Sequence, residues 1–551
     1  MTSTEPAESG PDSSVGIARS SALMASGTVL SRLTGVLRTS AIAAAIGFAT
    51  FADTYSIANS LPNIVYILIV GGAINSVFVP QLVRHMKSDK DGGDGYADRL
   101  LTLVGLVLLA VTVSAVVLAP WITRLYAPSN WTASDLHVST LFAYFLLPQI
   151  FFYGLYTMLQ QVLNARGAFG TPMFAPIVNN VVVIVAALVF IGVVGTSPTS
   201  STVTTTQVML LGISTTIGVI AQSLVLIPTA WRVGYRYKPR FDFRGQGLGK
   251  AGSLAGWTIG FVLVNQITLL IVTRLAAAAN VTLTGTNKVN VGFTSYQNAY
   301  LTFILPHSVI TVSLVTALLP ALSRAAHALD FAAISAQLAN AMRIVAVILM
   351  PVSAMLFVLG PRITQLLFAR GSASVEESIY TGYVLSAFVV GLVPFSLYYV
   401  LLRGYYSLED TRTPFWLTVW LNVTNLAIAL PLYLVVNPQY RVIVLALGFA
   451  LAYVIFLAVS WRVLSRRLGG LETYYTVRTM VRAGIASVPC GVATWFVLQG
   501  MLGLFTIHFI TLVLALGVAS AVGLGIFLGL AWIMHISEIR YLPKLVRRRA
   551  F

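Results

Sequence analysis

The stretch NARGAFGTPMFAPIVNN, residues 164–180, decides the architecture because it returns in outline as YSLEDTRTPFWLTVWLN at residues 406–422. Both stretches carry a Thr-Pro pair at the same place, and they end in Asn180 and Asn422. A second pair of segments, FVPQLVRH from Phe78 and LLPALSRA from Leu318, repeats in the same way. Offsets of 242 and 240 residues predict two structurally similar halves.

The composition places the chain in the membrane class. Of its 551 residues, 57% are hydrophobic and 9% are charged, whereas soluble domains have about 25% charged residues. Its mean hydropathy is +0.85. A single cysteine and six histidines exclude a disulfide framework and a cysteine-rich metal site. The first long apolar run carries an arginine in its interior, which predicts a retained span and not a cleaved signal peptide.

Apolar windows of about 20 residues predict membrane-spanning helices. We find fourteen such windows and no alternating pattern typical of a barrel. Their approximate limits are 17–47, 54–82, 99–121, 137–162, 173–194, 207–230, 251–278, 293–322, 338–360, 377–401, 415–436, 441–462, 480–500 and 507–534.

The repeat and the windows together predict an all-α polytopic membrane protein. It has two six-helix lobes, related by a pseudo-two-fold axis along the membrane normal because six is an even number, and a C-terminal helix pair. The predicted division is a disordered cytoplasmic tail 1–16, an N-lobe 17–232, a basic linker 233–250, a C-lobe 251–464, a helix pair 478–535 and a basic tail 536–551.

The net charge of +17 arises from 34 Lys and Arg against 17 Asp and Glu. With a cytoplasmic N-terminus, 26 of the basic residues fall in cytoplasmic segments, five outside and three within spans. Cytoplasmic loops of membrane proteins are enriched in Lys and Arg, so this count predicts that both termini are cytoplasmic. It also indicates attraction to anionic membrane lipids and not to nucleic acid.

Arg32 and Arg38 stand inside the first span, in SRLTGVLRTSAIAAAIGF. An arginine at the centre of a bilayer costs at least ~2.5–3.5 kcal/mol. One interpretation is that both face a water-filled cavity, since their six-residue spacing turns them by about 120° around the helix. The other is that each snorkels to its nearer membrane surface.

Other candidate residues lie in the second span and its counterpart. Asp53 is either a gate residue at the outer mouth or a helix N-terminal charge that suits the dipole. A direct pair with Arg38 is unfavourable, because the two differ by roughly 12 Å along a straight hairpin. Asn63, in LPN, is a candidate substrate contact. A proline in a membrane helix is often only a tolerated kink, but several interruptions in matching halves favour moving helices. These interruptions are Pro62, Gly71, Gly72, Pro80 and Pro306.

Enzyme motifs such as H-E-x-x-H, G-x-S-x-G and Walker A are missing from the sequence, and no metal-ligand cluster is visible. We therefore expect a transporter that uses no cofactor and is driven by membrane potential or by an ion gradient.

The segments SRLTGVLR, ADTYSIANSLPN, INSVFVPQL, LNARGAFGTPMFAP and ALLPALS occur in this order. With them the chain resembles the MurJ (MviN) family of lipid II flippases, within the multidrug/oligosaccharidyl-lipid/polysaccharide exporter superfamily. The resemblance implies fourteen helices, a cationic central cavity with Arg32, Arg38 and Asp53 at the family's positions, and a groove for the polyprenyl tail on the last two helices. It also implies a bacterial cytoplasmic membrane and a role in cell-wall synthesis.

The sequence departs from the family pattern in four respects. An Arg-Arg pair common after LPN is replaced by Tyr66 and Ile67, and a Glu by Gly71. An arginine of the eighth helix has no counterpart, and acidic residues of a sodium site are missing from helices seven and eleven. Arg274 is the remaining arginine within a span. It is either a compensating substrate ligand or a snorkelling residue at the outer end of its helix.

The favoured function is movement of an undecaprenyl-diphosphate-linked disaccharide-pentapeptide, lipid II, from the inner to the outer leaflet. A related exporter of another lipid-linked glycan or of cationic drugs would fit the fold, but a cation exporter should line its cavity with acidic residues. A scaffold that recruits cell-wall synthesis or division proteins would leave the buried arginines unexplained.

The orientation is testable with topology reporters. Fusions at Gly93, at Gly245 and after the C-terminus should report the cytoplasm, whereas fusions at Ser200 and Gly285 should report the outside. An outside signal at Gly245, in the most basic loop, would contradict the order of spans.

Overall fold

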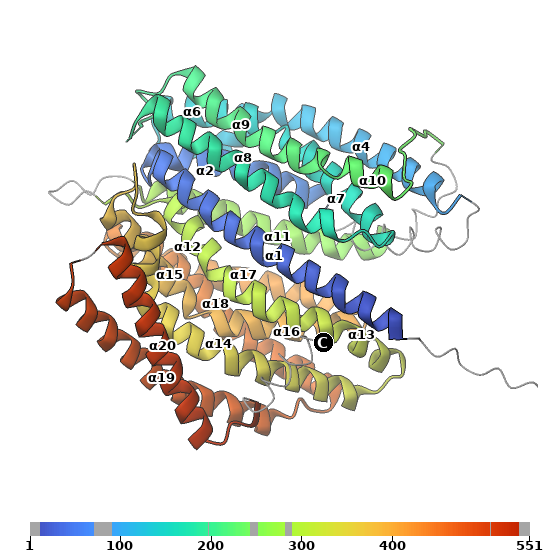
Figure 1. Cartoon of the computed structure of the whole chain (residues 1–551), viewed down its shortest axis with the longest axis vertical. Helices are drawn as coiled ribbons and strands as arrows, with labels where there is room; N and C mark the ends of the chain where they lie inside the picture. Colours follow the sequence, from blue (N-terminus) through green and yellow to red (C-terminus); the bar gives the residue numbers. More distant parts are fainter. Residues whose placement is uncertain are drawn as a thin grey trace, which may run out of the picture.

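The computed structural model describes residues 11–70, 91–196, 198–242, 252–280, 289–506 and 508–538, and all regular secondary structure within them is helical. Long helices run side by side in two groups, one from the first half of the chain and one from the second, with a final pair at the edge (Figure 1). Helices suit a membrane because every backbone group inside the span is paired within its own segment.

The helices of the first group pack mainly on one another, notably α1 on α8, α8 on α9 and α2 on α6. Their bounds are α1 Pro11–Ile46, α2 Thr50–Val70, α4 Asp94–Val117, α5 Ala119–Tyr126, α6 Ala133–Leu146, α7 Gln149–Ala165, α8 Gly170–Val194, α9 Thr205–Leu224 and α10 Ile227–Arg232.

The second group is closed in the same way, by contacts of α17 with α18, α12 with α15 and α11 with α17. Its elements are α11 Gly252–Ala278, α12 Phe293–Pro306, the π-turn η2 His307–Thr311, α13 Val312–His327, α14 Phe331–Phe368, α15 Val375–Val389, α16 Leu392–Ser407, α17 Arg412–Val435, the 3₁₀ turn η3 Pro438–Tyr440 and α18 Arg441–Leu468. The final pair, α19 Thr473–Leu504 and α20 Phe509–Ile533, packs against α14.

The described residues contain twelve helices that are long and apolar enough to cross a membrane, or thirteen if the bent pair α15 and α16 forms one span. The second expected span is helical over Thr50–Val70, and its remainder lies outside the described residues. A polytopic, all-helical membrane fold is thus confirmed, whereas the count of fourteen spans stays a prediction.

The sequence repeat corresponds to a repeat of helix boundaries. In the first half α6 begins at Ala133 and α8 at Gly170, and in the second half α15 begins at Val375 and α17 at Arg412, each 242 residues later. Both halves also interrupt one helix at corresponding positions, between α6 and α7 in the first half and between α15 and α16 in the second. The first break, between α6 and α7, coincides with Pro148, which has no backbone N–H to donate.

Asparagines at matching positions join matching helices. The Asn180 side chain on α8 donates to the Ser31 carbonyl and the Thr34 hydroxyl on α1, at 3.2 and 3.0 Å. In the second half Asn422 on α17 donates to Asn265 on α11 at 3.3 Å. Polar bonds of this kind hold membrane helices together where hydrophobic burial cannot. The two-fold axis itself stays a prediction.

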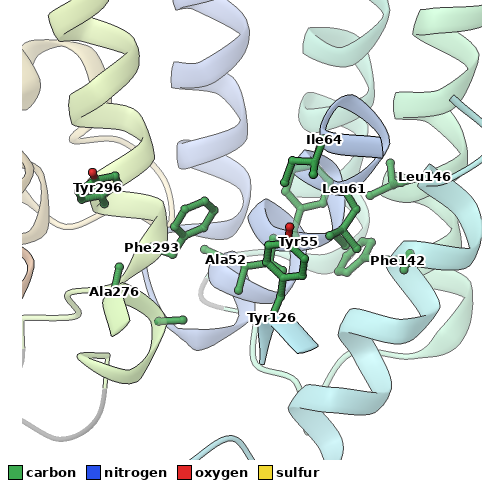
Figure 2. Packing of buried hydrophobic residues seen from close by; sticks show 14 of the residues in the cluster. Ala52, Tyr55, Leu61, Ile64, Tyr126, Phe142, Leu146, Ala276, Phe293 and Tyr296 are labelled. Atoms are coloured by element: carbon green, nitrogen blue, oxygen red, sulfur yellow. The ribbon is translucent and has the colours of Figure 1, made fainter. Parts of the chain in front are cut away.

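One apolar cluster joins the two groups near the start of α2. Figure 2 shows Ala52 and Tyr55 of α2 between Phe142 of α6 on one side and Ala276 of α11 and Phe293 of α12 on the other. Ala52 and Phe142 are fully buried. The groups therefore meet through a packed core at the end of the molecule that the charge pattern predicts to be outside.

Packing of α14 against α15 gives a stability prediction. A Cβ added at Gly382 of α15 would lie 2.2 Å from the Cα of Pro361, whereas nothing lies within 4 Å of one added at Gly525 of α20. Gly382→Ala should lower the midpoint of thermal unfolding in detergent, because overpacking costs about 1–3 kcal/mol. Gly525→Ala is the control, and should be neutral or stabilising because alanine favours helix. Equal effects of both changes would contradict the packing.

Candidate functional site

Arg32 and Arg38 line one cavity of about 450 Å³ between the two helix groups. They lie in the middle of α1, which Asn180 ties to α8. Arg32 is exposed and Arg38 is half-buried. The interpretation that both arginines share a cavity is therefore supported by their positions in the fold.

The cavity has walls from both halves of the chain. The first half contributes α1, α7 and α8, and the second contributes α12 and the end of α14. No acidic residue stands among the described residues that line it. The lining residues are Thr28, Ser31, Arg32, Gly35, Val36, Arg38, Thr39, Tyr153, Tyr156, Pro172, Met173, Pro176, Asn179, Asn180, Asn298, Leu301, Thr302, Ile304, Leu305 and Phe368.

Neither guanidinium has a hydrogen bond or an ion pair with a described residue. Arg38 lies close enough to Tyr55 and Tyr153 to interact with them electrostatically. Two unneutralised arginines in a polar cavity at membrane depth are tolerable where water or an anion solvates them. Each guanidinium presents a planar fork of donors that matches the oxygens of a phosphate.

Several wall residues could not be singled out from the sequence. Asn179 is buried, and its Oδ1 lacks a partner among the described residues. Tyr153 and Tyr156 face the cavity from α7. In the sequence these residues stand out only as polar positions within apolar windows. Polar residues that merely join one helix to another give the same pattern. Tyr66, where the family pattern has arginine, donates to Thr157 at 2.8 Å and stands against the ring of Tyr153.

Asp53 lies outside this cavity and is fully buried at the contact between the two halves. Its carboxylate accepts hydrogen bonds from the backbone N–H of Phe293 at 3.3 Å and of Thr294 at 2.7 Å. The Thr294 hydroxyl and the Asn280 amide donate to it at 2.7 and 2.8 Å. A residue of α2 thus satisfies the first N–H groups of α12, which is a favourable place for a carboxylate.

A second contact between the halves joins the end of α1 to the loop after α14. The Ser372 N–H donates to the Ala44 carbonyl at 2.8 Å, and its hydroxyl donates to the Ala45 carbonyl at 3.0 Å. Gly371 has φ +60°, and a Cβ there would stand 2.3 Å from the Ala44 oxygen. Phe368, which lines the cavity, packs edge-on against Phe48. These contacts close the predicted outer end of the cavity.

Arg274 and Asn63 are not brought to the cavity. The Arg274 guanidinium donates to the Leu125 carbonyl at the end of α5, at 3.0 Å. Arg274 lies 22 residues into α11, about 33 Å from its start, so it reaches the predicted outer end and not the depth of Arg32 and Arg38. Asn63 is exposed on α2. The compensating role expected for Arg274 therefore has no support in this arrangement.

Of the five predicted helix interruptions, the structure describes Pro62 and Pro306. Pro62 is buried within an unbroken α2. Pro306 ends α12, and the π-turn follows it directly. Gly71, Gly72 and Pro80 lie outside the described residues.

A family model described as "Lipid II flippase MurJ" matches residues 42–524, most of the chain. The chain belongs to the MurJ family. A relative from Haemophilus influenzae, named "Probable lipid II flippase MurJ", is 27% identical over 490 residues, which are 85% of this chain and 90% of the relative. A relative of the same name from Vibrio cholerae is 25% identical over 538 residues, covering 91% and 96%. The family match begins four residues after Arg38.

Solved structures support the same fold. A structure described as "Lipid II flippase MurJ, inward closed conformation" superposes with a TM-score of 0.70 at 19% identity, covering 94% of this chain and 99% of that one. An inward-facing multidrug transporter of the MATE family gives 0.62 at 15% identity, covering 80% and 96%. At these identities the likeness shows the fold alone.

We expect the hydrogen bonds of Asp53 to keep a labelling reagent out of the contact between the two halves. Ala276 belongs to the same apolar cluster as Phe293 (Figure 2) and is fully buried, so a cysteine at that position should react slowly with an impermeant maleimide. Asp53→Ala should raise the labelling rate several-fold, because each buried donor left unpaired costs about 1–3 kcal/mol. Asp53→Asn should have an intermediate effect.

Asp135→Ala is the matched control for this test. Asp135 also accepts bonds at a helix N-terminus, from the N–H and hydroxyl of Thr132, but within one half of the molecule. Labelling that rises equally in the Asp53→Ala and Asp135→Ala variants would contradict an inter-lobe seal.

Proposed function

We propose that this chain moves lipid II from the inner to the outer leaflet of the bacterial cytoplasmic membrane, without bond chemistry. The observation that carries the proposal is the pair of unpartnered arginines, Arg32 and Arg38, in a cavity between the two halves. Membership of the MurJ family supports the same conclusion, since relatives carry the name of lipid II flippase.

The substrate's diphosphate suits this cavity chemically. It carries about two negative charges, and two guanidinium forks can neutralise them with charge-assisted hydrogen bonds. A cavity of about 450 Å³ lies within the ~300–1,000 Å³ range of small-molecule sites. It has room for the diphosphate and an adjoining sugar, and the rest of the lipid would extend beyond it.

Movement between leaflets requires the cavity to open on alternate sides. The described contacts between the halves gather at the predicted outer end, around Asp53 and Ser372, which supports an inward-facing state with cytoplasmic termini. Outward opening would break the bonds of Asp53 to α12 and form new contacts at the cytoplasmic end. A loaded cavity would favour that change if it binds the diphosphate more tightly in one state than in the other.

The polyprenyl tail would remain in the apolar phase while its head group crosses. An apolar groove of about 280 Å³ lies between α14, α15 and α19, with Met350, Phe357 and Val390 in its walls. This groove supports a tail site beside the last helix pair.

A potential could drive the return of the empty carrier. With its arginines neutralised by the diphosphate the loaded form is nearly uncharged, and the empty form is positive. An inside-negative potential favours the inward return by ~2.3 kcal/mol per charge per 100 mV. The described residues contain no cluster of ligands for a metal ion.

Arg38 provides the direct test. Arg38→Ala should reduce lipid II flipping at least tenfold, since a hydrogen bond to a charged group contributes about 1.5–3 kcal/mol. Arg38→Lys should restore only part of the activity, because lysine cannot form the bidentate fork. Flipping is measured by the accessibility of lipid II in the outer leaflet.

Arg124→Ala removes one exposed arginine at the predicted outer surface, away from the cavity, and should retain activity. Equal amounts of inserted protein must be verified for each variant. Full flipping by Arg38→Ala would overturn the proposed role of the cavity.

A further inference from the structure

A large pocket lies on the flank of the first helix group. Its volume is about 920 Å³, near the upper end of the ~300–1,000 Å³ range of ligand pockets. The walls come from α4, α7 and α10 and from the segment 235–241 that follows α10. Apolar side chains such as Leu108, Leu155 and Trp231 make up most of the lining.

Helix α7 separates this flank pocket from the cavity of Arg32 and Arg38. Tyr153 and Tyr156 face the central cavity, whereas Phe151, Leu155 and Met158 face the flank pocket. The two share no lining residue among those described. The flank pocket also receives nothing from the second half of the chain, so it is distinct from the site proposed for the diphosphate.

The segment 235–241 is held across the predicted cytoplasmic end of α4. The Tyr235 hydroxyl and the Lys238 N–H donate to the Asp98 carboxylate at 2.9 and 3.2 Å. The Tyr237 hydroxyl lies 2.9 Å from that of Thr102. Burial, followed by the charge of Asp98, raises the pKa of Tyr235, which keeps its hydroxyl protonated as a donor. The pocket mouth is therefore built by fixed polar contacts.

Each described carboxylate beside this mouth already has partners. Asp94 pairs with Arg166, Asp98 lies 4.0 Å from Arg240, and Asp242 lies 2.7 Å from Arg99. Asp91 accepts from the backbone N–H groups of Gly93 and Gly95, which lower its pKa.

Arg236 is the one charged residue among the described residues that line the flank pocket, and it is exposed. It has no hydrogen bond or ion pair with a described residue. An apolar pocket thus ends in an unpaired cation at the level where the charge pattern predicts the cytoplasmic membrane surface.

We infer that the flank pocket binds a membrane phospholipid with an anionic head group, with an acyl chain among the apolar walls and the phosphate at Arg236. Basic pockets between helices on the cytoplasmic side bind anionic head groups in this way. Trp231 and Tyr237, 60% and 46% exposed at the mouth, are the aromatic types that favour the membrane interface.

The bilayer is the favoured source of this lipid. Lipid-exposed side chains of α4, including Leu106 and Leu109, form one wall, so an acyl chain can enter sideways from the membrane. A polyprenyl diphosphate held by Arg32 and Arg38 lies on the opposite side of α7 and would have to pass around that helix.

The test is lipid binding to the purified full-length chain, measured by mass spectrometry of the intact protein–lipid complex. Dioleoyl phosphatidylglycerol is compared with dioleoyl phosphatidylcholine, which has the same chains without net charge. Arg236→Gln should weaken phosphatidylglycerol binding about fivefold and leave phosphatidylcholine unaffected. Arg466→Gln, which removes another exposed arginine of a predicted cytoplasmic end, should change neither.

A second variant fills the pocket. A Cβ added at Gly105 on its wall would meet nothing within 4 Å, so Gly105→Phe should fold and reduce binding of both phospholipids. Gly525→Phe, on α20, is its control. Unchanged phosphatidylglycerol binding in both Arg236→Gln and Gly105→Phe would overturn the inference. So would a Gly105-dependent site that takes undecaprenyl phosphate in preference to phosphatidylglycerol.

Discussion

A carboxylate from one half of the molecule completes the first turn of a helix in the other half. The N-terminal N–H groups of α12 have no partners within the helix, and Gly292, which precedes it, offers no side chain to cap them. Asp53 of α2 supplies the missing acceptors. Caps of this kind contribute about 0.5–2 kcal/mol, and a buried carboxylate needs such donors to remain tolerable. The bond exists only when the two halves meet, so it ties helix stability to closure.

One helix connects this closure to the arginine cavity. Ala44 and Ala45, near the end of α1, accept hydrogen bonds from Ser372 of the other half. Arg38 lies about six residues earlier on the same helix, a distance of roughly 9 Å. Because α1 is unbroken over this interval, a tilt that releases its end also moves the guanidinium groups. The seal and the proposed substrate site are therefore mechanically coupled through a single rigid element.

Much of this architecture could be predicted from patterns in the sequence. The Thr-Pro and Asn positions of the repeat predicted matching helices, and Asn180 and Asn422 indeed join matching helix pairs. Helix geometry allowed Arg32 and Arg38 to face one cavity but did not exclude snorkelling. In the structure both line one cavity.

Contacts between the two halves were harder to predict from the sequence. The partner of Asp53 lies about 240 positions away, and the partner of Arg274 lies on α5. Helix tilt and rotation determine such pairs, and periodicity does not encode them. The flank pocket could not be predicted either. Its walls are apolar runs that read as ordinary membrane spans, and its cation stands in a loop that reads as a topology signal.

The two halves differ at their interruptions, and in the second half the interruption lies just beyond the cavity wall. The helix α2 continues through Pro62, whereas α12 gives way to a π-turn after Pro306. The fourteen residues of α12 carry the bonds to Asp53 at one end, and Asn298 and Thr302 face the cavity along its length. Beyond the π-turn, α13 packs against α14 and α16 within its own half. A π-turn replaces the regular hydrogen-bond ladder locally. It therefore separates α12, which packs on α15 and is also bonded to the first half, from α13, which packs within the second half.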